Sequence, residues 1–76
     1  MGYNKLVMKF LLVIQICSAV LQHCTEPLQI NTYNSHYDCA TAGFLKGITV
    51  LRELGVEYSN ENKMLMNFSC QELTSL

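Results

Sequence analysis

The sequence predicts a single small α+β domain, in which one long helix covers one face of a two- or three-stranded sheet and disulfides staple the fold. Segments rich in strand-forming residues lie near both ends, and the stretch between them has the apolar periodicity of a helix. Four cysteines in 76 residues are the third observation, because the core of so short a chain is marginal unless something staples it. We expect the domain over residues 8–76, with residues 1–7 as an N-terminal extension.

The first apolar segment, KFLLVIQICSAVLQHC, allows two interpretations. Lys5, Lys9 and the apolar run Phe10–Ile16 are arranged as in an export signal, and cleavage after Ala19 would remove residues 1–19. The same run is dense in residues typical of a strand buried on one or both faces. Cleavage would leave three cysteines, one helix and one good strand, which is too little to bury a core. We therefore expect a retained strand, and a cleaved signal peptide is the alternative.

Two further strands are predicted. Leu28–Tyr33 follows Glu26-Pro27 and alternates weakly, which indicates a short edge strand. The polar run Ser59–Lys63 is expected to be a loop. Met64–Cys70 alternates more clearly, which predicts a half-buried strand whose inner face lies against the helix. That inner face consists of Met64, Met66, Phe68 and Cys70.

The helix is expected from Ser35 to Leu54. Ser35 and Asp38 have the spacing of a capping box with Asp in place of Glu. Gly55 ends the helix, and Val56 is placed to contact the last turn as in a Schellman cap. Apolar residues recur at helical spacing, namely Tyr37, Ala40, Phe44, Ile48 and Leu51, flanked by Leu45 and Leu54.

Two glycines, Gly43 and Gly47, lie inside this helix. Each costs about 1 kcal/mol relative to Ala in an exposed helix. We expect them to allow close approach of the helix backbone to a neighbouring strand. A membrane dimerisation motif is excluded by the charged residues of the same helix.

The cysteines are expected to form two disulfides. The predicted topology brings Cys70 near Cys39 in the first turn of the helix, and Cys17 and Cys24 would then close the loop after the first strand. Four thiols allow three connectivities, so this pairing is a hypothesis, and buried free thiols or a metal site are the alternatives. On the chain-entropy model, Cys39–Cys70 contributes at most about 3.5 kcal/mol and Cys17–Cys24 about 2.5 kcal/mol.

Other chemistry is weakly indicated. His36-x-x-Cys39 with His23-Cys24 offers nitrogen and sulfur ligands for zinc, but there is no Cys-x-x-Cys. Cys39 at a helix N-terminus, one turn from His36, also resembles an activated thiol, although so short a chain has little room for a pocket. A disulfide explains the same cysteine, so we expect no enzyme activity, no metal and no cofactor.

Composition restricts the classes of partner. The net charge is −1, only 14% of residues are charged, and no basic stripe exists to neutralise phosphates, so nucleic-acid binding is disfavoured. No small-molecule substrate is indicated either. Three tyrosines, Tyr33, Tyr37 and Tyr58, are candidate contact residues for a protein partner.

From Met8 to Cys70 the chain resembles a large group of short uncharacterised four-cysteine proteins, encoded chiefly by marine bacteriophages, cyanophages among them. The matching elements are Met8-Lys9-Phe10-Leu11-Leu12-Val13, Cys17-Ser18, Cys24 with Pro27, Ser35-His36-Tyr37-Asp38-Cys39 with Ala42-Gly43, and Phe68-Ser69-Cys70. The resemblance implies that all four cysteines belong to one pattern, which supports pairing Cys17 with Cys24. It also suggests Met8 as the natural start.

The predicted function is a small non-enzymatic interaction protein, phage-encoded and directed at a host protein or at the envelope. Its outer sheet face and open edges would contact an unknown host or viral protein, and the open edges would also allow two copies to dimerise. A minor virion protein, a redox or metal-binding protein and an exported protein are the alternatives. Disulfides would place the protein in the periplasm or outside the cell, and free thiols in the host cytoplasm.

Overall fold

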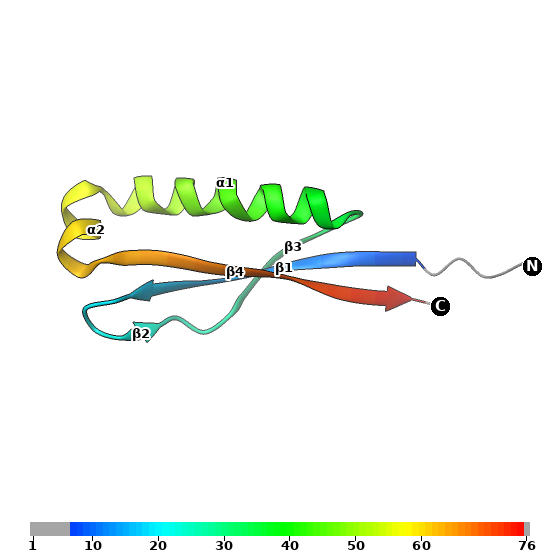
Figure 1. The fold of residues 1–76 in the computed structure, drawn as a ribbon, viewed down its shortest axis with the longest axis horizontal. Helices are drawn as coiled ribbons and strands as arrows, with labels where there is room; N and C mark the ends of the chain where they lie inside the picture. Colours follow the sequence, from blue (N-terminus) through cyan, green and yellow to red (C-terminus); the bar gives the residue numbers. More distant parts are fainter. Residues whose placement is uncertain (1–6, 76) are drawn as a thin grey trace, which may run out of the picture.

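The computed structural model describes residues 7–75, which form a four-stranded antiparallel sheet and two helices (Figure 1). β1 (Val7–Ser18) lies in the middle of the sheet, and β4 (Met64–Ser75) pairs with it along its full length. On the other side of β1, β3 (Leu28–Tyr33) and the two-residue β2 (His23–Cys24) pair with different parts of the strand. The predicted α+β class is confirmed, and β2 is an addition to it.

α1 (His36–Leu54) runs along one face of this sheet, and the short α2 (Val56–Asn62) connects it to β4 (Figure 1). The Asp38 N–H donates to the Ser35 hydroxyl oxygen at 3.0 Å, so the predicted N-cap is confirmed. Gly55, at φ 89°, ends the helix as expected, and its N–H donates to the Leu51 carbonyl at 3.0 Å. The predicted Schellman cap is not formed, because Gly55 has a ψ of 158°, outside the left-handed helical region, and Val56 begins α2 with its side chain 77% exposed.

β1 is the segment that also fits an export signal, and in the structure it is the most buried strand. Leu12 and Ile14 are 0% and 2% exposed on the face toward α1, and Val13 and Cys17 are buried on the opposite face. Burial on both faces explains why the apolar run is nearly continuous. The strand begins at Val7, the last residue of the predicted extension, and residues 1–6 lie outside the described residues.

The predicted loop over 59–63 is wrong, because 59–62 are the second half of α2. The Ser59 N–H donates to the Gly55 carbonyl at 3.0 Å, and Lys63 closes the helix with a positive φ of 50°. This run has no apolar periodicity that would predict a helix. Tertiary hydrogen bonds fix it instead, because the Ser18 hydroxyl donates to the Asn62 carbonyl at 2.7 Å.

The two outer strands occupy the predicted segments. β3 has the expected bounds, but its pairing with β1 shifts between Leu12 and Val13, which leaves Ile30 without a direct partner. β4 contains the predicted strand and extends it to Ser75. Burial alternates along β4 from Met64 to Cys70, as the sequence indicates.

Small residues form the closest contact between α1 and the sheet. Cys39 and Gly43 are the buried residues of the helix. A Cβ added at Gly43 would lie within 3.0 Å of three ring atoms of Phe68, and one at Gly47 would lie 3.3 Å from the terminal methyl of Met66. The expected close approach of the glycine backbone to a strand is therefore confirmed.

Both predicted disulfides are present. Cys39–Cys70 joins the first turn of α1 to β4, and Cys17–Cys24 joins β1 to β2. The buried core lies beside the first bridge, where Leu12, Ile14 and Cys39 pack together. The two staples therefore attach the helix and the β2 segment to the central pair of strands.

Candidate functional site

Among the candidate catalytic and metal residues, Cys24 and Cys39 are bridged, whereas His23 and His36 are exposed. Cys39 is fully buried and bridged to Cys70, so it offers neither a nucleophile nor a ligand while that disulfide is closed. The His36 ring packs edge-on against Phe10, with 6.0 Å between ring centroids. Among residues 7–75, no three His, Cys, Asp or Glu side chains lie close enough together to hold a metal ion.

The three candidate tyrosines do not form one surface. Tyr33, at the end of β3, is half-buried and packs against the core. Tyr37 is 77% exposed in the first turn of α1. Tyr58 is 51% exposed in α2, which lies at the opposite end of α1 (Figure 1).

The periodic apolar residues of α1, which we call the apolar stripe, remain largely exposed. Phe44 is 67% exposed, Ile48 50% and Leu51 39%. They lie on the β4 side of the helix, since the Phe44 ring packs edge-on against Phe68 of β4 with 5.1 Å between centroids. The stripe consists of Tyr37, Ala40, Phe44, Ile48 and Leu51.

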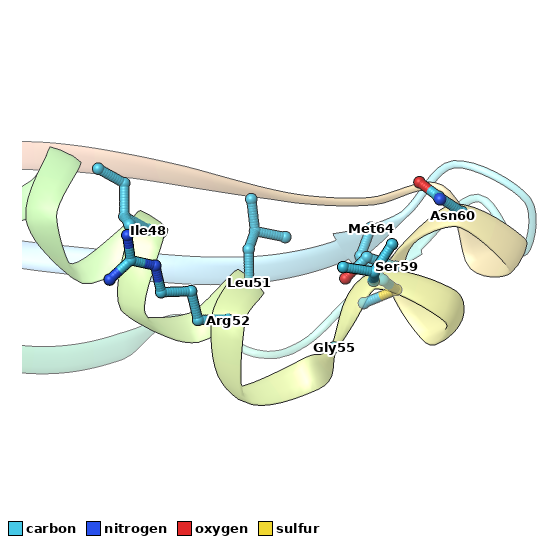
Figure 2. A pocket seen from close by; sticks show the side chains of 8 residues that line it. Ile48, Leu51, Arg52, Gly55, Ser59, Asn60 and Met64 are labelled. Carbon is cyan, nitrogen blue, oxygen red and sulfur yellow. The ribbon is translucent and has the colours of Figure 1, made fainter.

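A groove follows the stripe between α1 and β4. One part of about 280 Å³ is lined by Phe44, Ile48 and Leu51 on the helix and by Leu65 and other β4 residues on the strand. A second part of about 560 Å³ continues toward α2 and shares Ile48 and Leu51 with the first (Figure 2). The groove therefore extends along the C-terminal half of α1 and past its end.

The second part of the groove has a mainly apolar wall with a few polar groups. The Arg52 side chain lies beside it, on the last turn of α1 (Figure 2). The buried Ser59 hydroxyl has no hydrogen-bond partner among the described residues. An apolar surface with a small number of polar groups is typical of a binding site.

The β4 edge beside this groove is open, because among residues 7–75 β4 pairs only with β1. The Ala19 N–H donates to the Lys63 carbonyl at 3.1 Å. With the register of the two strands, this bond shows that the odd-numbered residues of β1 and β4 form the hydrogen bonds between them. Since alternate residues of an antiparallel strand bond to opposite sides, the even-numbered residues of β4 direct their N–H and C=O groups to the open edge. These residues are Met64, Met66, Phe68, Cys70, Glu72 and Thr74.

The outer face of β4, away from α1, has a different character. Asn67, Ser69 and Gln71 are exposed there, between the exposed apolar residues Leu65 and Leu73. Asn67, Ser69 and Gln71 also line a hollow of about 200 Å³. Its other lining residues are Val13, Gln15, Pro27 and Phe68. This row offers amide and hydroxyl groups and carries no charge.

No protein-family model, curated protein or solved structure matches the chain. The resemblance to phage-encoded proteins therefore stays a prediction. Neither helix within residues 7–75 is long and apolar enough to cross a membrane.

Sequence reasoning identified the stripe residues but not their exposure. The available signal was the position of Gly43 and Gly47, which lie about 100° and about 60° from the centre of the stripe around a helix of 3.6 residues per turn. If the glycines face the strands, the large residues must lie to one side of the contact.

Proposed function

We propose that this chain is a small non-enzymatic interaction protein, phage-encoded, that binds a host protein through the outer face of β4. The observation that supports it is the uncharged row of Asn67, Ser69 and Gln71, which is exposed on a strand held by a disulfide. Its amides and hydroxyl suit a protein surface that presents hydrogen-bonding groups rather than strong charge.

The architecture supports a preformed binding surface. β4 pairs with β1 over its whole length, and β1 is the buried centre of the sheet. A surface on paired strands loses little conformational freedom when it binds, so little of the interaction energy is spent on ordering it. A twelve-residue strand is also long enough to display several contacts in a fixed row.

The disulfides support a partner outside the reducing cytoplasm. All four cysteines are bridged, which is typical of proteins of the periplasm, the cell surface and the extracellular space. For a phage-encoded protein, this supports a partner in or beyond the host envelope.

The test is affinity capture from an envelope fraction of a marine cyanobacterium, the host class that the resemblance implies. The oxidised protein serves as bait beside two variants. N67A/Q71A removes both amides of the row, and T49A changes an exposed residue of α1 as the matched control. We expect one protein to be captured by the unmodified and T49A baits and about tenfold less by N67A/Q71A. Equal capture by all three baits, or no capture by the unmodified bait, would contradict the proposal.

A further inference from the structure

We propose that the open β4 edge and the apolar stripe together form a homodimer interface. Two chains pair antiparallel through their β4 edges, and their α1 helices meet across the same two-fold axis. The inference goes beyond the proposed function, because the outer face of β4 stays uncovered in such a dimer. The two sheets would join into one continuous sheet, with both helical layers on the same side.

The two edges of the sheet differ in how they are protected. β3, at one edge, is six residues long, follows Pro27 and has an irregular register, all of which hinder pairing with another chain. β4, at the other edge, is twelve residues long and has no proline, no lysine and a single charged residue, Glu72. An edge of this kind is a template for another strand, and proteins usually block or cover such edges.

The backbone N–H and C=O groups that pair across the interface belong to the half-buried residues of β4. Met66 and Phe68 direct their N–H and C=O groups to the open edge and their side chains toward α1. A strand added at this edge would therefore extend the helix-covered face of the sheet, and its inner side chains would enter the groove beside Phe44 and Ile48. A second copy supplies such a strand together with its own helix.

The stripe is symmetric about Phe44. Ala40 and Ile48 lie four residues to either side of Phe44, and Tyr37 and Leu51 lie seven residues to either side. In an antiparallel pair of helices related by a two-fold axis at Phe44, Ile48 meets the partner's Ala40 and Leu51 meets the partner's Tyr37. Each of these contacts then occurs twice about the axis and Phe44 meets its own copy, as in an isologous interface.

The strand and helix contacts are compatible in one dimer. Phe44 packs against Phe68, so an axis at Phe44 passes near Phe68 in β4. α1 contacts Leu12 and Ile14 of β1 as well as β4, so it lies over the space between the two strands. With strands about 4.8 Å apart, two such helices would lie about 10 Å apart, within the usual range of about 8–10 Å for packed helices.

Pairing of two β4 strands brings no like charges together. Pairing β4 with itself about Phe68 sets Glu72 opposite the partner's Met64. No like charges oppose one another along the strand, and the pairing therefore has no electrostatic penalty.

The test is sedimentation equilibrium over a range of concentrations. It compares the oxidised full chain with its variants I48K and L45K. Ile48 and Leu45 are similarly exposed residues of α1, 50% and 60%, but Leu45 is not in the stripe. We expect the unmodified chain and L45K to reach twice the 8.6 kDa mass of one chain. I48K should raise the dissociation constant of the dimer by about 100-fold or more, because the lysine occurs twice in a symmetric apolar interface.

Amide hydrogen exchange gives a second measurement that needs no variant. In the dimer, the Phe68 and Cys70 amides donate across the interface, so their protection should increase with protein concentration. A chain that stays monomeric, a dimer that I48K leaves intact, or exchange at Phe68 that does not depend on concentration would each overturn the proposal. These outcomes do not depend on Asn67 or Gln71, so the proposed function can fail or succeed separately.

Discussion

The two apolar sides of α1 differ in the size of their side chains and in their burial. Large apolar side chains are usually the buried ones, but here the smaller residues are buried and large ones are exposed. The side that packs on the sheet carries Cys39 and Gly43, both buried, together with Gly47. The side toward the open edge of β4 carries Phe44 and Ile48, which are at least half exposed. This helix is oriented by a disulfide and by close approach of its backbone to the strands. Its larger side chains remain available for another contact.

The largest expected effect comes from removing the bridge on the buried side. C39A/C70A opens a loop with a sequence separation of 31, and C17A/C24A one of only 7. On the chain-entropy model the first variant should lose about 3.5 kcal/mol of unfolding free energy and the second about 2.5 kcal/mol. Urea unfolding of both variants measures the difference. A larger loss from C17A/C24A would contradict the prediction that the bridge of the helix contributes more to stability.

The two glycines give a sharper comparison within the buried side. Gly43→Ala places a methyl group against the Phe68 ring, which Phe44 and the core hold in place. We expect overpacking of about 1–3 kcal/mol to exceed the helix-propensity gain of about 1 kcal/mol, so the variant should be less stable.

Gly47→Ala is the matched control, because its new methyl group meets only the flexible end of Met66, at 3.3 Å. There the propensity gain of about 1 kcal/mol should remain, and the protein should be as stable as before or slightly more stable. Thermal and urea unfolding of both variants test this. If Gly43→Ala is also stabilising, the helix is not held as close to β4 as the structure indicates.

Local signals predicted most of the fold. Ser35 and Gly55 set the ends of α1 through hydrogen bonds to their own neighbours, and such bonds can be read from a few adjacent residues. The alternation of Met64–Cys70 reflects a strand with one buried face. The disulfide hypothesis followed from placing these elements side by side, and both bridges are confirmed.

What the sequence could not show depends on contacts between distant segments. α2 forms from a polar run that Ser18 and Ala19 hold through hydrogen bonds to Asn62 and Lys63. The rotation of α1 about its axis is decided by how closely Gly43 approaches Phe68, which periodicity alone does not reveal. The candidate site lies in the part of the molecule that this rotation leaves open.

The smallest expected effect concerns the exposed side. Ile48→Ser changes the size and polarity of a residue that is 50% exposed, and the two residues have similar helix propensities. In dilute protein, where the monomer predominates, the unfolding free energy should fall by less than about 1 kcal/mol. Truncation of the fully packed Ile14 to Ala should cost about 2–5 kcal/mol, because it leaves a cavity in the core.

Ile48→Ser and Ile14→Ala also distinguish a residue that is buried between two chains from one that is buried within a single chain. Unfolding followed at low and at high protein concentration should show that the loss from Ile48→Ser grows with concentration, since a residue in a dimer interface stabilises the fold only when the partner is bound. The loss from Ile14→Ala should be nearly independent of concentration. A large loss from Ile48→Ser in dilute protein would mean that the stripe packs within one chain, and the two sides of α1 would then no longer differ.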